Sequence, residues 1–238
     1  MPSNRASKQK GISLVELMVG IAIGLFIVAA ATVLTSTQLF ENRRLVLEMQ
    51  IQQDLRASSD IISRDIRRAG AWWTSDTSVW VSGTINHPFV SDVRGMTPNV
   101  TLVPVSEIQY KYVRADGVPR QYGFKLSGEK IRSYFPNGGG WQDLTDGNTL
   151  VVDSFSITPK FVNEPTPGGT DPQKMPCPKL CPDGSTDCWP TVLVRDFEIF
   201  ISGHAKTDST VVRSVRSTVR VRNDEPQINT ADGNYCPS

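Results

Sequence analysis

The chain has 238 residues, with 25 basic and 24 acidic side chains and a formal net charge of +1. Three basic residues, Arg5, Lys8 and Lys10, precede the first apolar run, so the rest of the chain is nearly balanced in charge. This balance gives no argument for nucleic-acid binding, and none is predicted. The length allows one medium-sized domain or two small ones after that run.

The apolar run spans residues 12–34 and follows a basic leader, residues 1–11. A helix of that length rises about 34 Å, which is enough to cross a hydrocarbon core of about 30 Å. The run contains one carboxylate, Glu16. An acidic side chain costs about 2.5–3.5 kcal/mol at the centre of a spanning helix and less near its end. Glu16 therefore needs an explanation.

The N-terminus also resembles a secretory signal peptide. Its apolar run is longer than an ordinary signal sequence, although Ala29–Ala31 leave a cleavage site open as an alternative. We expect a retained span, with the leader in the cytoplasm and everything after about Gln38 exported.

A single helix is predicted from residue 12 to residue 70, because no proline occurs there and glycines are few. Residues 12–34 form its membrane or filament-core half, and residues 35–70 form an amphipathic half. One stripe of that half is apolar: Leu47, Ile51, Leu55, Ile62 and Ile66. Gly70 is placed to end the helix in a left-handed conformation.

After Gly70 the sequence is typical of antiparallel strands and predicts one β-rich head domain, residues 71–238. Strands are expected at 108–113, 121–128, 130–135, 149–162, 191–206 and 210–223, with turns at Asp116-Gly117 and Ser127-Gly128. In the last strand, valines alternate with arginines, Arg213 among them, and the phase slips near Arg216. Residues 71–105 receive no assignment, although their tryptophans suggest packing against the end of the helix. The fold class is therefore α+β.

Four cysteines lie in the C-terminal third: Cys177, Cys181, Cys188 and Cys236. Three of them fall in a proline-rich loop, residues 163–190. An even number of cysteines in an exported domain favours disulfides over a zinc site, whose usual ligand spacing is absent. Three pairings are open, and we favour a link from the loop to Cys236, which would contribute roughly 4 kcal/mol.

No pattern predicts catalysis, a cofactor or a metal site. His87 and His204 lie far apart and adjoin no nucleophile in a recognisable arrangement. Acidic residues at turns could hold calcium, but no calcium-loop motif is present, and solvated carboxylates are the simpler interpretation: Asp143, Asp146, Asp153, Asp224 and Glu225. We expect a protein that is not an enzyme.

The leader ends at Gly11, the apolar Ile12 follows, and Glu16 is fifth from the new N-terminus. Residues 10–19, KGISLVELMV, resemble the processing motif of type IV prepilins, whose usual first mature residue is phenylalanine. The resemblance implies that a prepilin peptidase cuts between Gly11 and Ile12 and methylates the amino group of Ile12. It also implies a pilin fold, with the helix in the core of a filament.

A filament explains the carboxylate, because Glu16 of one subunit can pair with the N-terminal amine of a neighbour. The ion pair would stabilise only subunits that are correctly aligned along the filament axis. Gly20 and Gly24 form a small-residue face that lets helices approach closely in lipid, and they join Glu16 as candidate assembly residues.

The segment 63–70, the tyrosine-rich strands and the closing VRVRN resemble the minor pilin family called type IV pilus assembly protein W. That family is related to the J-type pseudopilins of type II secretion, which are the alternative. The resemblance implies a non-catalytic subunit that primes a type IV pilus and belongs to its tip complex, serving twitching motility and adhesion. Its implied partners are minor and major pilins, prepilin peptidase and in some cases a large tip adhesin.

Before assembly the protein would sit in the inner membrane with its head in the periplasm, and afterwards at the pilus tip. A membrane-anchored periplasmic enzyme or binding protein is the remote alternative, and it predicts an intact leader.

Overall fold

The computed structural model describes residues 11, 13–71, 104–161, 173–223, 225–227, 236 and 237. The chain divides into two compact units, Met1–Leu47 and Glu48–Ser238. One helix, α1 (Leu14–Ile66), provides the described structure of the first unit and continues into the second. All strands belong to the second unit, and they form antiparallel sheets. The predicted α+β class with a long N-terminal helix is confirmed.

α1 is a continuous helix of 53 residues. Three hydroxyls in and just after its apolar run bond within the helix, because those of Thr32, Thr35 and Thr37 each donate to the carbonyl four residues earlier at 2.8–3.0 Å. These three hydroxyls therefore do not need water as a partner.

The end of α1 tightens before it stops. The amides of Arg68 and Ala69 bond to carbonyls three residues back, at 3.0 Å each, so the helix proper ends at Ile66 rather than at residue 70. Gly70 follows with φ of 70°, the left-handed conformation predicted for it. The chain then runs alongside the first strand, since the Gly70 amide donates to the Lys111 carbonyl at 2.8 Å.

The first sheet is an antiparallel meander of β1 (Glu107–Val113), β2 (Pro119–Ser127), β3 (Lys130–Phe135) and β4 (Gly140–Asp143). The first three strands match the predicted ones within two residues. Both predicted turns contain a glycine with positive φ, Gly117 at 73° and Gly128 at 61°. The fourth strand is short and was not predicted.

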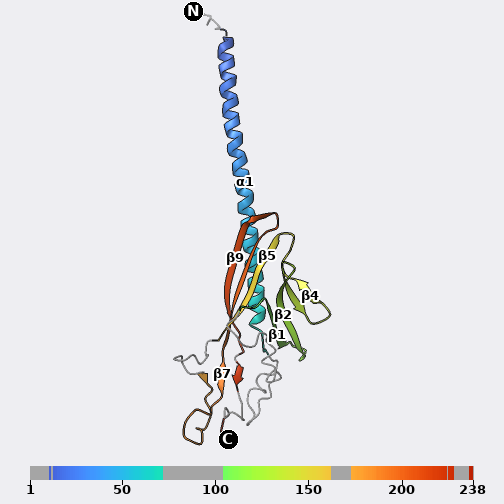
Figure 1. Ribbon diagram of the computed structural model, residues 1–238, viewed down its shortest axis with the longest axis vertical. Coiled ribbons are helices and arrows are strands. Elements are labelled where there is room, and N and C mark those ends of the chain that lie inside the picture. Colours follow the sequence, from blue (N-terminus) through green and yellow to red (C-terminus); the bar gives the residue numbers. More distant parts are fainter. Residues whose placement is uncertain are drawn as a thin grey trace, which may run out of the picture. The chain divides into compact units, whose positions relative to one another are not determined.

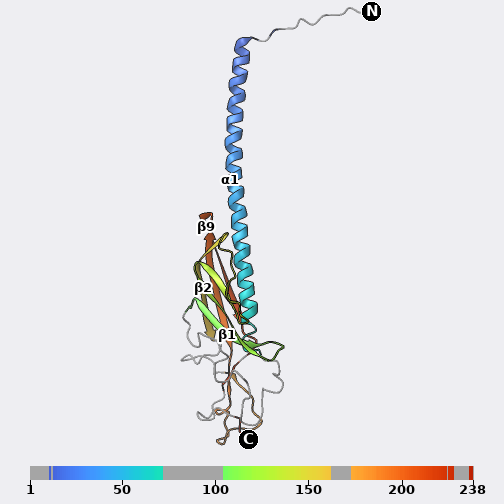
Figure 2. The same cartoon turned by 90° about the vertical axis from the view of Figure 1, so that its right-hand side faces the viewer.

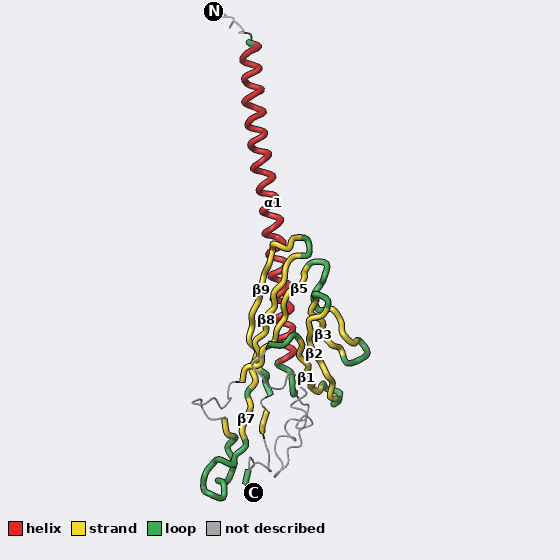
Figure 3. Tube along the Cα trace, viewed as in Figure 1, coloured by secondary structure: helices red, strands yellow, loops and turns green. Residues whose placement is uncertain are grey.

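The second sheet places β5 (Leu150–Phe161), β8 (Arg195–Ala205) and β9 (Asp208–Arg220) side by side in that order, as Figure 3 shows. A third, small sheet contains β10 (Glu225–Gln227), β7 (Thr191–Leu193) and β6 (Gln173–Lys174). The prediction of one strand over 191–206 was wrong. That segment divides at Val194 because β7 pairs with β6 and β10, whereas β8 pairs with β5 and β9.

The core of the second unit lies between the last part of α1 and the sheets. Figures 1 and 2 together show this part of the helix running along one face of the β5–β8–β9 sheet. The predicted apolar stripe is buried at Ile51, Leu55, Ile62 and Ile66, all at 1% exposure or less, and Leu47 at its start is half-buried. β8 alternates strictly between buried and half-buried residues, as expected of a strand with one face on a core.

Polar contacts cross the same interface. Ser59, on the buried stripe of α1, lies 2.7 Å from the hydroxyl of Ser217 on β9. Glu48 of α1 accepts a charge-assisted bond from Arg213 of β9. Arg213 thus shares the inward face with Val211 and Val219, so the predicted placement of Arg213 opposite the valines was wrong, and β9 has no phase slip near Arg216.

Candidate functional site

The first candidate site is the N-terminal part of α1. Glu16 stands in the first turn and is the only charged side chain from Leu14 to Phe40. Its negative charge lies where the helix dipole is positive, which is the favourable end for a carboxylate. Gly11 is exposed just before the helix, whereas Ile12, the other residue of the predicted cleavage site, lies outside the described residues, as does leader segment 1–10.

The apolar side chains around Glu16 are exposed within the chain. Leu14, Phe26 and Leu34, for example, expose 73%, 77% and 65% of their surface. A Cβ atom added at Gly20 or Gly24 would meet nothing within 4 Å, so the small-residue face is open. Apolar surface around the whole circumference of a helix indicates a partner other than water, either lipid or further apolar helices.

Among the described residues, α1 is the helix that is sufficiently long and apolar to span a membrane, and it lies near the N-terminus. The prediction of a single apolar helix capable of anchoring the chain is therefore confirmed.

The second candidate site is the cysteine region of the head. Cys177 is bonded to Cys236, and Cys181 is bonded to Cys188. All four cysteines are thus in disulfides, and the favoured link from the loop to Cys236 is the one that the structure has. The chain on either side of the small Cys181–Cys188 ring is joined by a hydrogen bond, because the Trp189 indole donates to the Lys179 carbonyl at 3.0 Å.

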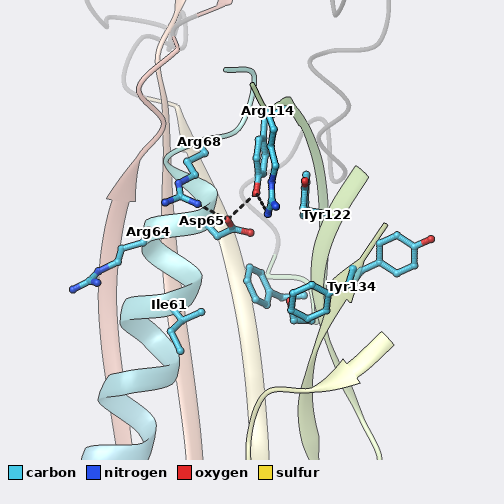
Figure 4. Close-up of a pocket in the computed structure, with 11 residues that line it drawn as sticks. Ile61, Arg64, Asp65, Arg68, Arg114, Tyr122 and Tyr134 are labelled. Atoms are coloured by element: carbon cyan, nitrogen blue, oxygen red, sulfur yellow. Dashed lines mark hydrogen bonds and ion pairs between the residues drawn. The ribbon is translucent and has the colours of Figure 1, made fainter. Parts of the chain in front are cut away.

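A third cluster joins the end of α1 to β1. Asp65 accepts hydrogen bonds from the hydroxyls of Tyr110 and Tyr112, the latter at 3.3 Å, and Arg68 lies 3.8 Å from the same carboxylate. Arg114 in turn donates to the Tyr112 hydroxyl at 3.4 Å. Figure 4 shows this chain of contacts, with Asp65 between Arg68 and the tyrosine that bonds to Arg114.

The environment keeps these tyrosines protonated. Burial raises the pKa of Tyr110 well above its ordinary value, and the charge of Asp65 adds to the effect. Burial likewise raises the pKa of Tyr112 to about 12, against the opposing influence of the Arg114 guanidinium. Neutral hydroxyls are the donors that the Asp65 carboxylate requires, so the cluster fastens the helix end to β1.

A cavity of about 230 Å³ adjoins this cluster. It lies between α1 and the first sheet and is lined by arginine and aromatic side chains, including Arg64, Arg114, Tyr122 and Phe135. The cluster of Asp65, Tyr110 and Tyr112 was not predicted from the sequence. A signal existed, because Tyr110 and Tyr112 are two apart on a strand and must share a face.

His204 and Asp143, which the sequence also raised as candidates for chemistry, have structural partners. His204 pairs with Asp153 at 2.9 Å, where β5 has a bulge, and His87 lies outside the described residues. Asp143 pairs with Lys130 and Arg132 at 2.7 and 2.8 Å, and these partners lower the pKa of its carboxyl.

Three other carboxylates were considered as calcium ligands. Asp146 accepts a hydrogen bond from the backbone amide of Asn148 at 2.9 Å, and Glu225 is the first residue of β10. Asp224 lies outside the described residues. The part of the chain that the structure describes contains no group of three or more metal-ligating side chains.

Comparison with known families gives two matches. The family described as prepilin peptidase-dependent protein B matches residues 44–221, and the prokaryotic N-terminal methylation motif matches residues 6–32. No curated protein and no solved structure matches the chain. The first match covers most of the head and the last part of α1, and the second covers the processing motif and the apolar part of α1.

Proposed function

The chain belongs to the family of prepilin peptidase-dependent protein B, and on this basis we propose that it is a minor pilin that primes a type IV pilus and forms part of its tip complex. A prepilin peptidase removes residues 1–11 and methylates the amino group of Ile12. The role is non-catalytic, since assembly requires only an amine, a carboxylate and apolar surface on the helix.

The observation that carries this proposal is Glu16, the one charged side chain on an exposed apolar stretch of helix. In the uncut precursor the amine of residue 12 does not exist, because residues 1–11 are still attached. Cleavage creates that amine four residues from Glu16. A neighbouring subunit can then offer its amine to the carboxylate, and a subunit out of register leaves both charges unpaired in an apolar environment.

The proposed location follows from the same arrangement. The apolar part of α1 anchors the protein in the inner membrane with its head in the periplasm, and assembly moves the head to the pilus tip. The partners are the α1 helices of other minor pilins and of the major pilin, and Gly20 and Gly24 allow these helices to approach closely. At the tip, the head contributes to adhesion and twitching, in some systems beside a large adhesin.

The test compares Glu16→Ala with Glu41→Ala, an exposed glutamate on the same helix. Intact mass should show removal of residues 1–11 in both variants, because the peptidase acts at Gly11. Glu16→Ala should lower the protein recovered in sheared pili, and pilus number, by at least about tenfold, which is about 1.4 kcal/mol of lost assembly free energy. Glu41→Ala should assemble normally.

Normal piliation by Glu16→Ala would contradict the register argument, and an intact leader in the wild-type protein would contradict the whole proposal. Deleting the gene separates the pilus from type II secretion. A deletion that abolishes twitching and leaves secretion intact supports the pilus role, whereas the reverse result would assign the chain to the J-type pseudopilins.

A further inference from the structure

The face of the first sheet that points away from α1 carries an unusual row of residues. Strand pairing places Gln109 of β1 opposite Gly123 of β2, Gly123 opposite Tyr134 of β3, and Tyr134 opposite Trp141 of β4. Directly paired residues of antiparallel strands share a face, so these four positions form one line across the sheet. Figure 4 shows Tyr134 pointing away from the helix, on this outer face.

Gly123, in the middle of this row, is buried because β1 covers it: a Cβ atom built on it would lie 2.6 Å from the carbonyl oxygen of Ile108 and 3.3 Å from the side chain of Gln109. No larger residue fits there without shifting β1. Beside this row lies a hollow of about 180 Å³, lined by Gln109, Gln121, Tyr122, Tyr134 and Trp141. This volume is below the range of drug-sized pockets and suits a single ring.

Two aromatic rings form one wall of the hollow. The ring centroids of Tyr134 and Trp141 are 5.4 Å apart, at an interplanar angle of 60°. The ammonium group of Lys125 lies 4.1 Å from the Trp141 centroid. Each ring is only partly buried, although most aromatic side chains of this sheet are packed inside. Aromatic faces carry partial negative charge and attract the weakly positive hydrogens of C–H groups.

Hydrogen-bonding groups in fixed orientation form the opposite wall. Gln121 donates an amide hydrogen to the side-chain oxygen of Gln109, and Gln109 donates to the Glu107 carboxylate at 2.6 Å. These two bonds fix the orientation of both side-chain amides, and they leave the side-chain oxygen of Gln121 as an acceptor. A ligand in the hollow therefore meets C–H-attracting rings on one side and hydroxyl-binding amides on the other.

We propose that this hollow, lined by Gln109, Gln121, Tyr122, Tyr134 and Trp141, binds a single neutral pyranose unit of a glycan. A pyranose has one face of C–H groups and a rim of hydroxyls, and the two walls match these two surfaces. Lys125 stands opposite Glu107 on paired strands, and Arg132 pairs with Asp143 at 2.8 Å, so most charges beside the hollow are offset, which favours an uncharged sugar. The cation–π contact of Lys125 is worth about 0.5–1 kcal/mol, so a sugar ring can displace it.

This inference goes beyond the assembly role and is independent of it, since no residue of the hollow lies on α1. Glycan binding can therefore be measured in protein that assembles normally, and it can fail while piliation stays intact.

The test uses the full processed chain in a non-glycosidic detergent and saturation-transfer difference NMR. The probes are the methyl glycosides of glucose, galactose, mannose and N-acetylglucosamine. At least one should bind with a dissociation constant of about 1–10 mM, the range for one ring on a shallow site. Trp141→Ala should weaken that binding at least about tenfold, and Gln121→Ala about fivefold or more.

Matched controls come from the opposite face of the same sheet. Phe135→Ala removes an exposed aromatic residue that lines the cavity beside α1, and Gln142→Ala removes an exposed amide next to Trp141 on β4. Both should bind the glycoside as the wild type does, and thermal melts should show that every variant is folded.

Three results would overturn the proposal. They are no transfer to any of the four glycosides, equal binding by the wild type and Trp141→Ala, and a Trp141→Ala variant that keeps glycoside binding but loses piliation. The last would assign the hollow to a contact with another subunit.

Discussion

The two parts of α1 both carry large apolar residues but differ in how far they bury them. Leu25, before the boundary at Leu47, exposes 66% of its surface, whereas Leu55, after it, exposes none. From Leu14 to Phe40, apolar residues occupy every side of the helix apart from Glu16; from Glu41 onward, they form a stripe flanked by charges. One continuous helix can therefore combine two tasks, because its second part buries an apolar stripe in the head while its first part leaves apolar surface exposed for the proposed assembly partners.

The largest effect should come from truncating matched leucines in the two parts. Leu55→Ala should destabilise the head by about 2–5 kcal/mol, because it leaves a cavity against the sheets. Leu25→Ala should change the unfolding free energy by no more than about 0.5 kcal/mol. Urea unfolding of the processed protein in detergent, followed by near-ultraviolet circular dichroism, measures both. Equal losses in the two variants would mean that the parts are not independent in folding.

The second effect concerns the polar contact that fastens the helix end. Tyr110→Phe should cost about 1–3 kcal/mol, because it removes a buried donor to Asp65. Tyr134→Phe, on the outer face of the same sheet, serves as the control and should be nearly neutral. The same urea experiment applies, and a neutral Tyr110→Phe would show that burial alone holds the helix end in place.

The pH dependence sharpens this point. Folding raises the pKa of Tyr110 above the ordinary value of 10.0, so the folded state favours the neutral phenol. Its contribution is fully present below about pH 10 and is lost as the pH rises further, because the unfolded chain then releases a proton that the folded chain retains. Wild-type stability should fall above pH 10 more steeply than that of Tyr110→Phe. Parallel curves would show that other groups cause the alkaline loss.

The smallest effect should appear near the boundary between the two parts. Glu48 and Arg213 are partly exposed, with side-chain exposures of 20% and 38%, so a double-mutant cycle should give a coupling of about 0.2–1 kcal/mol that falls with added salt. Glu41→Gln, seven residues earlier, should leave head stability unchanged. A coupling that salt does not weaken would indicate a desolvated pair.

Local patterns predicted the long elements well, and tertiary pairing explains the misses. The stripe from Ile51 to Ile66 and the first three strands follow from periodicity alone. Arg213 was misplaced because an arginine on an inward face is stable only when a partner such as Glu48 meets it, and strand sequence does not reveal that partner. Ser59 was missed for the same reason, since its buried hydroxyl is matched by that of Ser217 on β9, which the helix sequence does not reveal.

The candidate sites divide in the same way. The processing motif is contiguous in sequence, so Gly11, Ile12 and Glu16 could be identified without a structure. The Asp65 cluster and the hollow beside Gly123 each combine residues that are brought together only by pairing. The Cys177–Cys236 link likewise depends on pairing. Cys177 follows β6 and Cys236 follows β10, and both strands pair with β7 in the small third sheet.

The bond between Cys177 and Cys236 has a mechanical consequence. It encloses β7, β8, β9 and β10 in a covalent ring with a sequence separation of 59 residues. When tension acts on the chain ends, these residues cannot be drawn out, and about 200 Å of contour length is withheld. The ring contains β8 and β9, two strands of the sheet that packs on α1. They therefore cannot be extended under load, so a stretched chain has less conformational freedom to lose when it refolds.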